Sequence, residues 1–136
     1  MRHEMDTSCT YRPWDGRHSV SYTLLNAEGQ KIQTNAKRLS LPRNDPLLLS
    51  LRAVEFGVQA LHYIDTDSVT VYSDEPAVVA WLDGACVPRR GYRQAVTRIR
   101  QRIRMLPTQV TFRWGMDSQP EHIQQPTQAK ALPLSA

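Results

Sequence analysis

Segments with the two-residue hydrophobic period of strands and segments with the 3.6-residue period of helices follow one another in a definite order along this chain. That order limits its possible folds more than any other feature of the sequence. Residues 19–24 read Ser-Val-Ser-Tyr-Thr-Leu, with an apolar side chain at every second position, which is the period of a half-buried strand. The turn sequence Asn-Ala-Glu-Gly at 26–29 leads into another strand over 30–39, so the two segments predict a hairpin. A short strand is expected before the hairpin, over residues 4–9.

A helical period begins at Pro46, soon after the hairpin. Proline suits the first turn of a helix, and Asn44 or Asp45 can cap that turn. Apolar residues then recur on one side of the segment, at Leu47, Leu51, Val54, Val58 and Leu61. This pattern predicts a long helix that buries one side and ends near Leu61.

The second half of the chain returns to strand and helix periods. Residues 68–73 are rich in β-branched side chains and predict a central strand. Pro76 begins a short helix that Gly84 can end, and residues 92–106 form an amphipathic helix with one apolar stripe. Residues 109–114 alternate again. The order β, β, β, α, β, α, α, β predicts a mixed sheet with helices packed on it.

Positive charge is concentrated in one segment of the chain. Between Gly84 and Met116 the sequence has eight arginines and neither Asp nor Glu, whereas the net charge of the whole chain is only +4. The rest of the chain is therefore acidic. Arginine pairs bidentately with phosphate and with carboxylate, so this segment predicts a polyanionic partner, either nucleic acid or an acidic protein surface.

The arginines of the amphipathic helix form two rows beside its apolar stripe. The shorter row consists of Arg98 and Arg102, and the longer row lies on the other side of the stripe. We expect the longer row, together with two arginines that precede the helix, to bind nucleic acid; these residues are Arg89, Arg90, Arg93, Arg100 and Arg104. The alternative is a solvated helix face, or internal pairing with the acidic remainder. A membrane-surface helix is not expected, because the core needs the short apolar stripe.

Aromatic side chains fall into two groups. Tyr11, Trp14 and Tyr92 lie in or beside expected loops, where they can stack on nucleic-acid bases or cover an edge of the core. The second group occupies periodic positions and is expected in the core; it consists of Trp81, Phe112 and Trp114.

Length and composition indicate one cytoplasmic domain. A chain of 136 residues has room for a single core, and no apolar run approaches the roughly 20 residues of a bilayer-spanning helix. The first residues lack the apolar segment of a secretory signal, and two cysteines, Cys9 and Cys86, predict neither a disulfide framework nor a zinc site. We expect a domain over residues 1–116, a loose tail over 117–136 and no membrane association. The sequence leaves the oligomeric state open.

Several short strings, in order, resemble the ribonuclease H family over roughly residues 4 to 124. Val-Tyr-Ser-Asp at 71–74, followed by the paired valines of 77–82, is similar to the strand and helix that carry one of the family's catalytic aspartates. Met-Asp-Thr-Ser-Cys at 5–9 resembles the first-strand signature of the family, with threonine in place of its usual glycine. Residues 51–61 and 111–114 are similar to the first helix and the last strand.

The resemblance implies an α/β fold of the ribonuclease H type, with a five-stranded mixed sheet and helices on both faces. It also implies a site in which four carboxylates hold two divalent ions, Mg²⁺ or Mn²⁺. Asp6 and Asp74 match the first and third of these carboxylates. Ser50 falls where the second acid normally lies, and Glu55, five residues later, points about 140° away around the helix. The predicted acidic set is therefore incomplete.

Three functions follow from these observations. The first is a catalytically impaired ribonuclease H-like module that binds RNA, DNA or their hybrid through the arginine segment, with Asp6 and Asp74 as a residual metal site or as capping carboxylates. The second is an active, divergent ribonuclease H that cuts the RNA of RNA–DNA hybrids, with Asp117 or Glu121 as a substitute acid. The third is a protein-interaction scaffold, since one fold hosts many functions.

Overall fold

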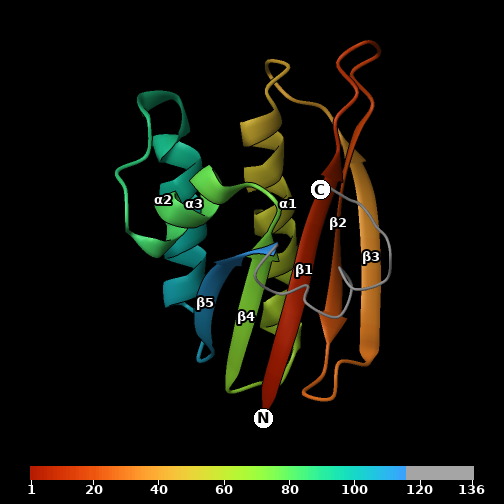
Figure 1. The fold of residues 1–136 in the computed structure, drawn as a ribbon, viewed down its shortest axis with the longest axis vertical. Helices are drawn as coiled ribbons and strands as arrows, with labels where there is room; N and C mark the ends of the chain where they lie inside the picture. The colour runs from red at the N-terminus through yellow and green to blue at the C-terminus, as the bar shows by residue number, and fades with distance from the viewer. Residues whose placement is uncertain (116–136) are drawn as a thin grey trace, which may run out of the picture.

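The computed structural model describes residues 1–115, whose arrangement is shown in Figure 1. The strands are β1 (Arg2–Thr10), β2 (His18–Leu25), β3 (Lys31–Leu39), β4 (Ser68–Ser73) and β5 (Gln109–Trp114). The helices are α1 (Pro46–Ala60), α2 (Pro76–Asp83) and α3 (Arg93–Arg104), and a single 3-10 turn follows α1 and another precedes α3. All the predicted elements are present in the predicted order, and the predicted tail over 117–136 lies outside the described residues.

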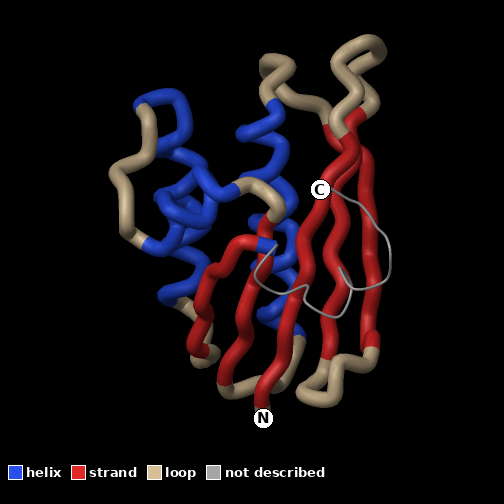
Figure 2. Tube along the Cα trace, in the orientation of Figure 1, coloured by secondary structure: helices blue, strands red, loops and turns tan. Residues whose placement is uncertain are grey.

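The five strands form one mixed sheet in the order β3-β2-β1-β4-β5. The first three strands pair antiparallel, whereas β4 pairs in parallel with both β1 and β5. Parallel neighbours need long crossover connections, which here contain the helices (Figure 2). The strand expected to be short, β1, has nine residues and lies at the centre of the sheet. Its sequence signal is weak because its buried positions include the polar residues His3 and Thr7.

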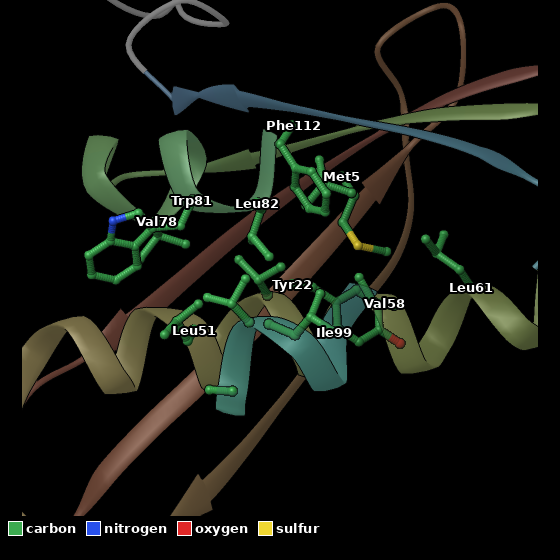
Figure 3. Packing of buried hydrophobic residues seen from close by; sticks show 14 of the residues in the cluster. Met5, Tyr22, Leu51, Val58, Leu61, Val78, Trp81, Leu82, Ile99 and Phe112 are labelled. Carbon is green, nitrogen blue, oxygen red and sulfur yellow. The ribbon is translucent and has the colours of Figure 1, made fainter. Parts of the chain in front are cut away.

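The described helices pack against one face of the sheet. Met5 of β1 lies in register with Val71 of β4 and Leu24 of β2, and all three side chains are buried. Figure 3 shows the cluster built on this face, to which every helix contributes, with Leu51 and Val58 from α1, Leu82 from α2 and Ile99 from α3. The expected helical cover of the opposite face has no counterpart in residues 1–115.

Helix α1 approaches the sheet closely at Gly57. A Cβ atom at this position would lie 2.6 Å from Met5 Sδ and 3.3 Å from Thr7 Cγ2. Glycine weakens a helix interior by roughly 0.5–1 kcal/mol relative to alanine. Its presence here lets the backbone of α1 contact β1, and this contact fixes where the helix crosses the sheet.

The helix ends form as the sequence predicts. Asp45 caps α1, because its carboxylate accepts hydrogen bonds from the backbone N–H groups of Leu47 at 3.0 Å and Leu48 at 3.3 Å. Gly84 ends α2 in the left-handed conformation, with a φ of 84°. Within the described residues, no helix is both long enough and apolar enough to cross a membrane.

Two of the three aromatic residues predicted for the core are buried. Trp81 and Phe112 expose 4% and 8% of their surface. The prediction for Trp114 is wrong, because this side chain is 38% exposed. Trp114 is the last residue of the edge strand β5, and its partner in the neighbouring strand is the polar residue Ser73.

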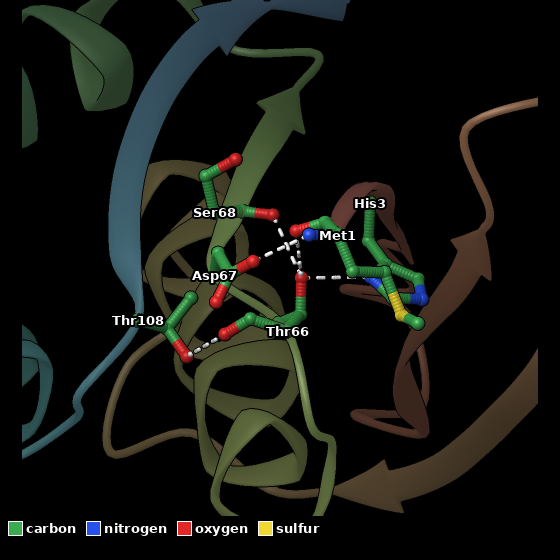
Figure 4. A network of polar contacts seen from close by, with 6 residues as sticks. All are labelled: Met1, His3, Thr66, Asp67, Ser68 and Thr108. Carbon is green, nitrogen blue, oxygen red and sulfur yellow. Dashed lines mark hydrogen bonds and ion pairs between the residues drawn. The ribbon is translucent and has the colours of Figure 1, made fainter.

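A polar network joins the starts of β1 and β4 to the segment before β5 (Figure 4). The hydroxyl of Thr66 lies 2.8 Å from His3 Nδ1 and 2.9 Å from the carbonyl oxygen of Ser68. The same hydroxyl lies 3.2 Å from the carbonyl oxygen of Met1. Carbonyl oxygens can only accept, so Thr66 directs its one proton toward these two oxygens and accepts from the Nδ1–H of His3. Thr108 in turn donates to the carbonyl oxygen of Thr66 at 3.0 Å. This network holds three segments together at the end of the sheet where β1 and β4 begin.

Candidate nucleic-acid interface and carboxylate site

The two aspartates singled out from the sequence lie on neighbouring parallel strands. Asp6 of β1 is in register with Tyr72 of β4, and Asp74 directly follows the last residue of β4. Asp74 lies two residues beyond Tyr72 along the strand direction, and neighbouring strands are about 4.8 Å apart. The Cα atoms of Asp6 and Asp74 are therefore about 8 Å apart. Asp6 is partly buried and Asp74 is exposed. The fold thus brings this predicted pair to one region of the sheet.

The position where the resemblance places the second acid is occupied by a buried serine that faces β1. Ser50 is 7% exposed, and its hydroxyl lies 3.8 Å from the thiol of Cys9. Burial raises the pKa of the Cys9 thiol, the charges of Asp74 and Glu75 raise it further, and the contact with Ser50 opposes them. A neutral thiol and a hydroxyl therefore stand near Asp74, and neither is a ligand that Mg²⁺ prefers.

Glu55 is the acidic residue of α1 that follows Ser50 in the sequence, and its carboxylate pairs with arginines of α3. Arg98 donates to it from Nε at 2.6 Å and from a terminal nitrogen at 3.2 Å. The Nε of Arg102 lies 3.5 Å from the same carboxylate, which is within ion-pair distance but without hydrogen-bond geometry. Within residues 1–115, no group of three or more His, Cys, Asp or Glu side chains could hold a metal ion. The acids expected near the fourth position, Asp117 and Glu121, lie outside the described residues.

The two arginine rows of α3 have different surroundings. Arg98 and Arg102 face Glu55, whose single negative charge offsets one of their two positive charges within the molecule. In the other row, Arg100 donates to the backbone carbonyl of Trp81, and Arg93 donates through Nε to the carbonyl of Pro88 at 3.3 Å. These are neutral acceptors, so the guanidinium charges of this row are not cancelled by them. Arg104 is exposed and lines a hollow of about 380 Å³ between α2, α3 and β5.

The segment between α2 and α3 carries an arginine–aromatic cluster. The rings of Trp81 and Tyr92 stack with their centroids 4.9 Å apart, and the guanidinium of Arg89 lies 5.5 Å from each centroid. Within the described residues, the side chain of Arg89 makes no hydrogen bond or ion pair, so its guanidinium lies against the rings and its N–H donors remain available. Arg90 is exposed beside it.

A further arginine of this cluster, Arg43, was not singled out from the sequence. Its guanidinium lies 5.5 Å from the ring centroid of Tyr92, and its Nε donates to Asp45 at 3.1 Å. The hydroxyl of Tyr92 donates to the same carboxylate at 2.6 Å. Burial would raise the pKa of Asp45, but the bonds from Tyr92, from the helix N–H groups and from Arg43 lower it below its usual range. The charge of Arg43 is therefore offset by the helix cap, and no sequence pattern marked this contact.

The three loop aromatics differ in how much of the ring is available. Tyr11 stacks on His18, with the ring centroids 5.2 Å apart, and Tyr92 stacks on Trp81. Trp14 is 74% exposed, with the guanidinium of Arg12 at 5.6 Å from its ring. Of these three residues, only Trp14 presents most of its ring to solvent.

The loop that carries Trp14 is held against the start of α1. The buried ring of His18 accepts at Nδ1 from the backbone N–H of Arg12 at 3.0 Å, so its other nitrogen, 3.2 Å from Asn44 Oδ1, carries the proton. Asn44 also donates to the carbonyl of Pro13 at 3.3 Å. Figure 1 shows this loop and the segment before α1 next to one another at one end of the molecule. These hydrogen bonds hold in place the loop that presents the exposed ring of Trp14.

The arrangement of strands and helices matches solved structures of ribonucleases H. RNase H1 from the halophilic archaeon Halobacterium salinarum gives a TM-score of 0.68 at 17% identity, over 84% of this chain and 85% of that one. LC11-RNase H1, isolated from compost, gives a TM-score of 0.70 at 14% identity, over 83% of each chain. The chain therefore has the ribonuclease H fold, as the sequence predicts.

Other similar structures contain nucleic acid. LC11-RNase H1 in complex with an RNA/DNA hybrid gives a TM-score of 0.64 at 13% identity, over 82% of this chain and 83% of that one. The foamy viral protease-reverse transcriptase in complex with an RNA/DNA hybrid gives 0.59 at 12% identity, over 90% of this chain and 18% of that one. No protein-family model matches the sequence, and no curated protein matches it significantly. At these identities the likeness establishes the fold alone.

Proposed function

We propose that this protein is a catalytically impaired ribonuclease H-like module that binds nucleic acid through an arginine surface. The surface consists of Arg89, Arg90, Arg93, Arg100 and Arg104. The observation that carries the proposal is the contrast between the two rows of α3. The row facing Glu55 shares a carboxylate inside the molecule, whereas the arginines of the proposed surface have no carboxylate within ion-pair distance in residues 1–115.

The geometry of Arg89 supports nucleic acid as the partner. A guanidinium stacked on two aromatic rings is oriented before binding, and it loses less conformational entropy when it pairs bidentately with a phosphate. Similar folds are known in complex with RNA/DNA hybrid, which is a duplex with regularly spaced phosphates. A surface with several unpaired arginines matches that chemistry better than it matches a partner with isolated acids.

Impaired catalysis is supported by the residues around Asp74. Two divalent ions about 4 Å apart require several carboxylates directed at one point. Asp6 and Asp74 lie on neighbouring strands, but the second position holds Ser50, beside Cys9, and Glu55 is held by Arg98. Mg²⁺ takes hard oxygen ligands and keeps waters in place of missing ones, so two carboxylates would hold it weakly.

The binding surface is tested by measuring affinity for an RNA–DNA hybrid, a DNA duplex and a single strand across a salt series. Each phosphate contact adds about 0.9 to the slope of log affinity against log salt for a duplex and about 0.7 for a single strand. We expect Arg89→Gln and Arg93→Gln each to lower the slope by about one contact. Arg38→Gln on β3 is the matched control with the same change in charge. A slope near zero in the unmodified protein would exclude a phosphate-binding surface.

The second candidate, an active nuclease, is favoured by one observation, the placement of Asp6 and Asp74 on neighbouring strands. It predicts cleavage of the RNA strand of a hybrid in Mg²⁺ or Mn²⁺, with loss of cleavage in Asp74→Asn. Asp117→Asn and Glu121→Gln then identify the substitute acid. Cleavage of this kind would replace the proposal of impaired catalysis while leaving the binding surface in place.

A further inference from the structure

A hollow between the end of β3 and the outer side of α1 is separate from the arginine surface proposed above. Lys37 and Ser40 line it from the strand side, and Arg52, Glu55 and Gln59 line it from the helix. These three helix residues recur at helical spacing along one side of α1. The volume of the hollow is about 170 Å³.

The hollow has more positive than negative charge. Its one carboxylate, Glu55, is already bound by Arg98 and approached by Arg102. Within residues 1–115, neither Lys37 nor Arg52 has a carboxylate within ion-pair distance. The ammonium of Lys37 lies 4.8 Å from the ring centroid of Phe56, which orients it without neutralising it. Two cations therefore flank the space without a counter-charge of their own.

Arg52 has a donor that the described residues leave unsatisfied. Its Nε–H is buried and has no hydrogen-bond partner. An unsatisfied buried donor costs about 1–3 kcal/mol, and more when it belongs to a charged group. An anionic acceptor entering the hollow would balance the excess charge, and it would satisfy this donor once the Arg52 side chain turned its Nε–H, which is closed off from solvent here, toward the space.

We propose that this hollow binds a phosphate group through Arg52 and Lys37. At about 30 Å³ per water molecule, the space accommodates one phosphate group with a few waters. Arg52 offers planar donors, Lys37 a point charge, and the Ser40 hydroxyl and Gln59 amide further donors. The phosphate comes either from free inorganic phosphate or from the terminus of a nucleotide chain. The site does not depend on the proposed nucleic-acid surface.

The test is titration of the full chain with inorganic phosphate at constant ionic strength, balanced with chloride. Calorimetry gives the affinity, and the Nε–H resonance of Arg52 in ¹H–¹⁵N spectra reports the contact directly. We expect that resonance to shift with phosphate, and affinity to fall about 10-fold or more in Arg52→Gln, which removes a charge-assisted interaction. Lys37→Met should weaken binding as well, and it provides a second test should Arg52→Gln fail to fold.

Arg38→Gln is the matched control, because Arg38 follows Lys37 on β3 and points to the opposite face of the strand. It should leave phosphate affinity within about twofold of the unmodified protein. The source is distinguished with one oligonucleotide carrying either a 5′-phosphate or a 5′-hydroxyl. Tighter binding of the phosphorylated form, abolished by Arg52→Gln, assigns the site to a chain terminus; equal binding of both forms assigns it to free phosphate. Absence of phosphate binding, an unchanged Arg52 resonance, or equal affinity in Arg52→Gln would overturn the proposal.

Discussion

Replacing Glu55 by glutamine would separate the structural role of the arginines on α3 from their capacity to bind a polyanion. The side chain of Glu55 is 9% exposed, and it joins α1 to α3 through Arg98 and Arg102. Glutamine has nearly the same shape and retains one carbonyl acceptor. It removes the one negative charge that the two arginines share. The variant should therefore be less stable and yet bind nucleic acid more tightly.

The expected loss of stability follows from the exposure of the partners. Removing one member of a fully buried ion pair costs about 3–5 kcal/mol. Both arginines are 37% exposed, so water screens the charges that the substitution releases, and glutamine keeps a hydrogen bond with Arg98. We expect the free energy of unfolding to fall by about 1–2 kcal/mol. The salt dependence of duplex binding should steepen by about one phosphate contact, a change in slope of about 0.9, because one negative charge is removed.

Both quantities can be measured on the same preparations. Denaturant unfolding gives the free energy, and fluorescence anisotropy with a labelled duplex across a salt series gives the slope. Glu28→Gln is the control, because it makes the same change in charge in the exposed turn between β2 and β3. A Glu55→Gln protein with unchanged stability and unchanged slope would refute the view that Glu55 offsets charge in this row.

Three further predictions concern other parts of the fold. Trp14→Ala should weaken binding of a single strand by about 1–3 kcal/mol, measured by anisotropy, and change stability by less than about 0.5 kcal/mol; equal loss for duplex and single strand would argue against base stacking. Gly57→Ala should destabilise the protein by about 1–3 kcal/mol in denaturant unfolding, because the added methyl meets Met5, and a neutral result would show that α1 can shift. The lowered pKa of Asp45 stabilises the fold above the ordinary pKa of an aspartate, and this contribution is lost as pH falls through the lowered value. Asp45→Asn should therefore flatten the acid limb of the stability profile while keeping the helix cap; an unchanged limb would assign it to other acids.

The elements of the fold could be predicted where local pattern and tertiary contact agree. The strands over 68–73 and 109–114 have the predicted bounds, and α1 begins at the predicted proline. The length of β1 could not be predicted, because its buried residues include His3 and Thr7, whose burial depends on a hydrogen bond to Thr66 and one to the Tyr72 carbonyl. Such contacts join residues more than sixty positions apart, and no local window contains them.

The two rows of arginines on α3 could be predicted from the sequence, whereas the partners of each row could not. Helical spacing separates the arginines of α3 into two rows, but only the packed structure shows that Glu55 lies against the row of Arg98. The contact of Arg43 with Tyr92 also arises from packing, since a loop and a distant helix start meet there. Conversely, the resemblance to the ribonuclease H family implies an acid where this sequence has Ser50, and that inference needs only the alignment of one helix.

The most direct test of the account combines binding and cleavage in one sample. An RNA–DNA hybrid labelled on the RNA strand is incubated with the full chain in Mg²⁺ and, separately, in Mn²⁺, and anisotropy and strand length are followed together across a salt series. The account predicts binding that weakens steeply with salt while the RNA strand stays intact in both metals. Metal-dependent cleavage of the RNA that disappears in Asp74→Asn, or binding that does not respond to salt, would contradict it.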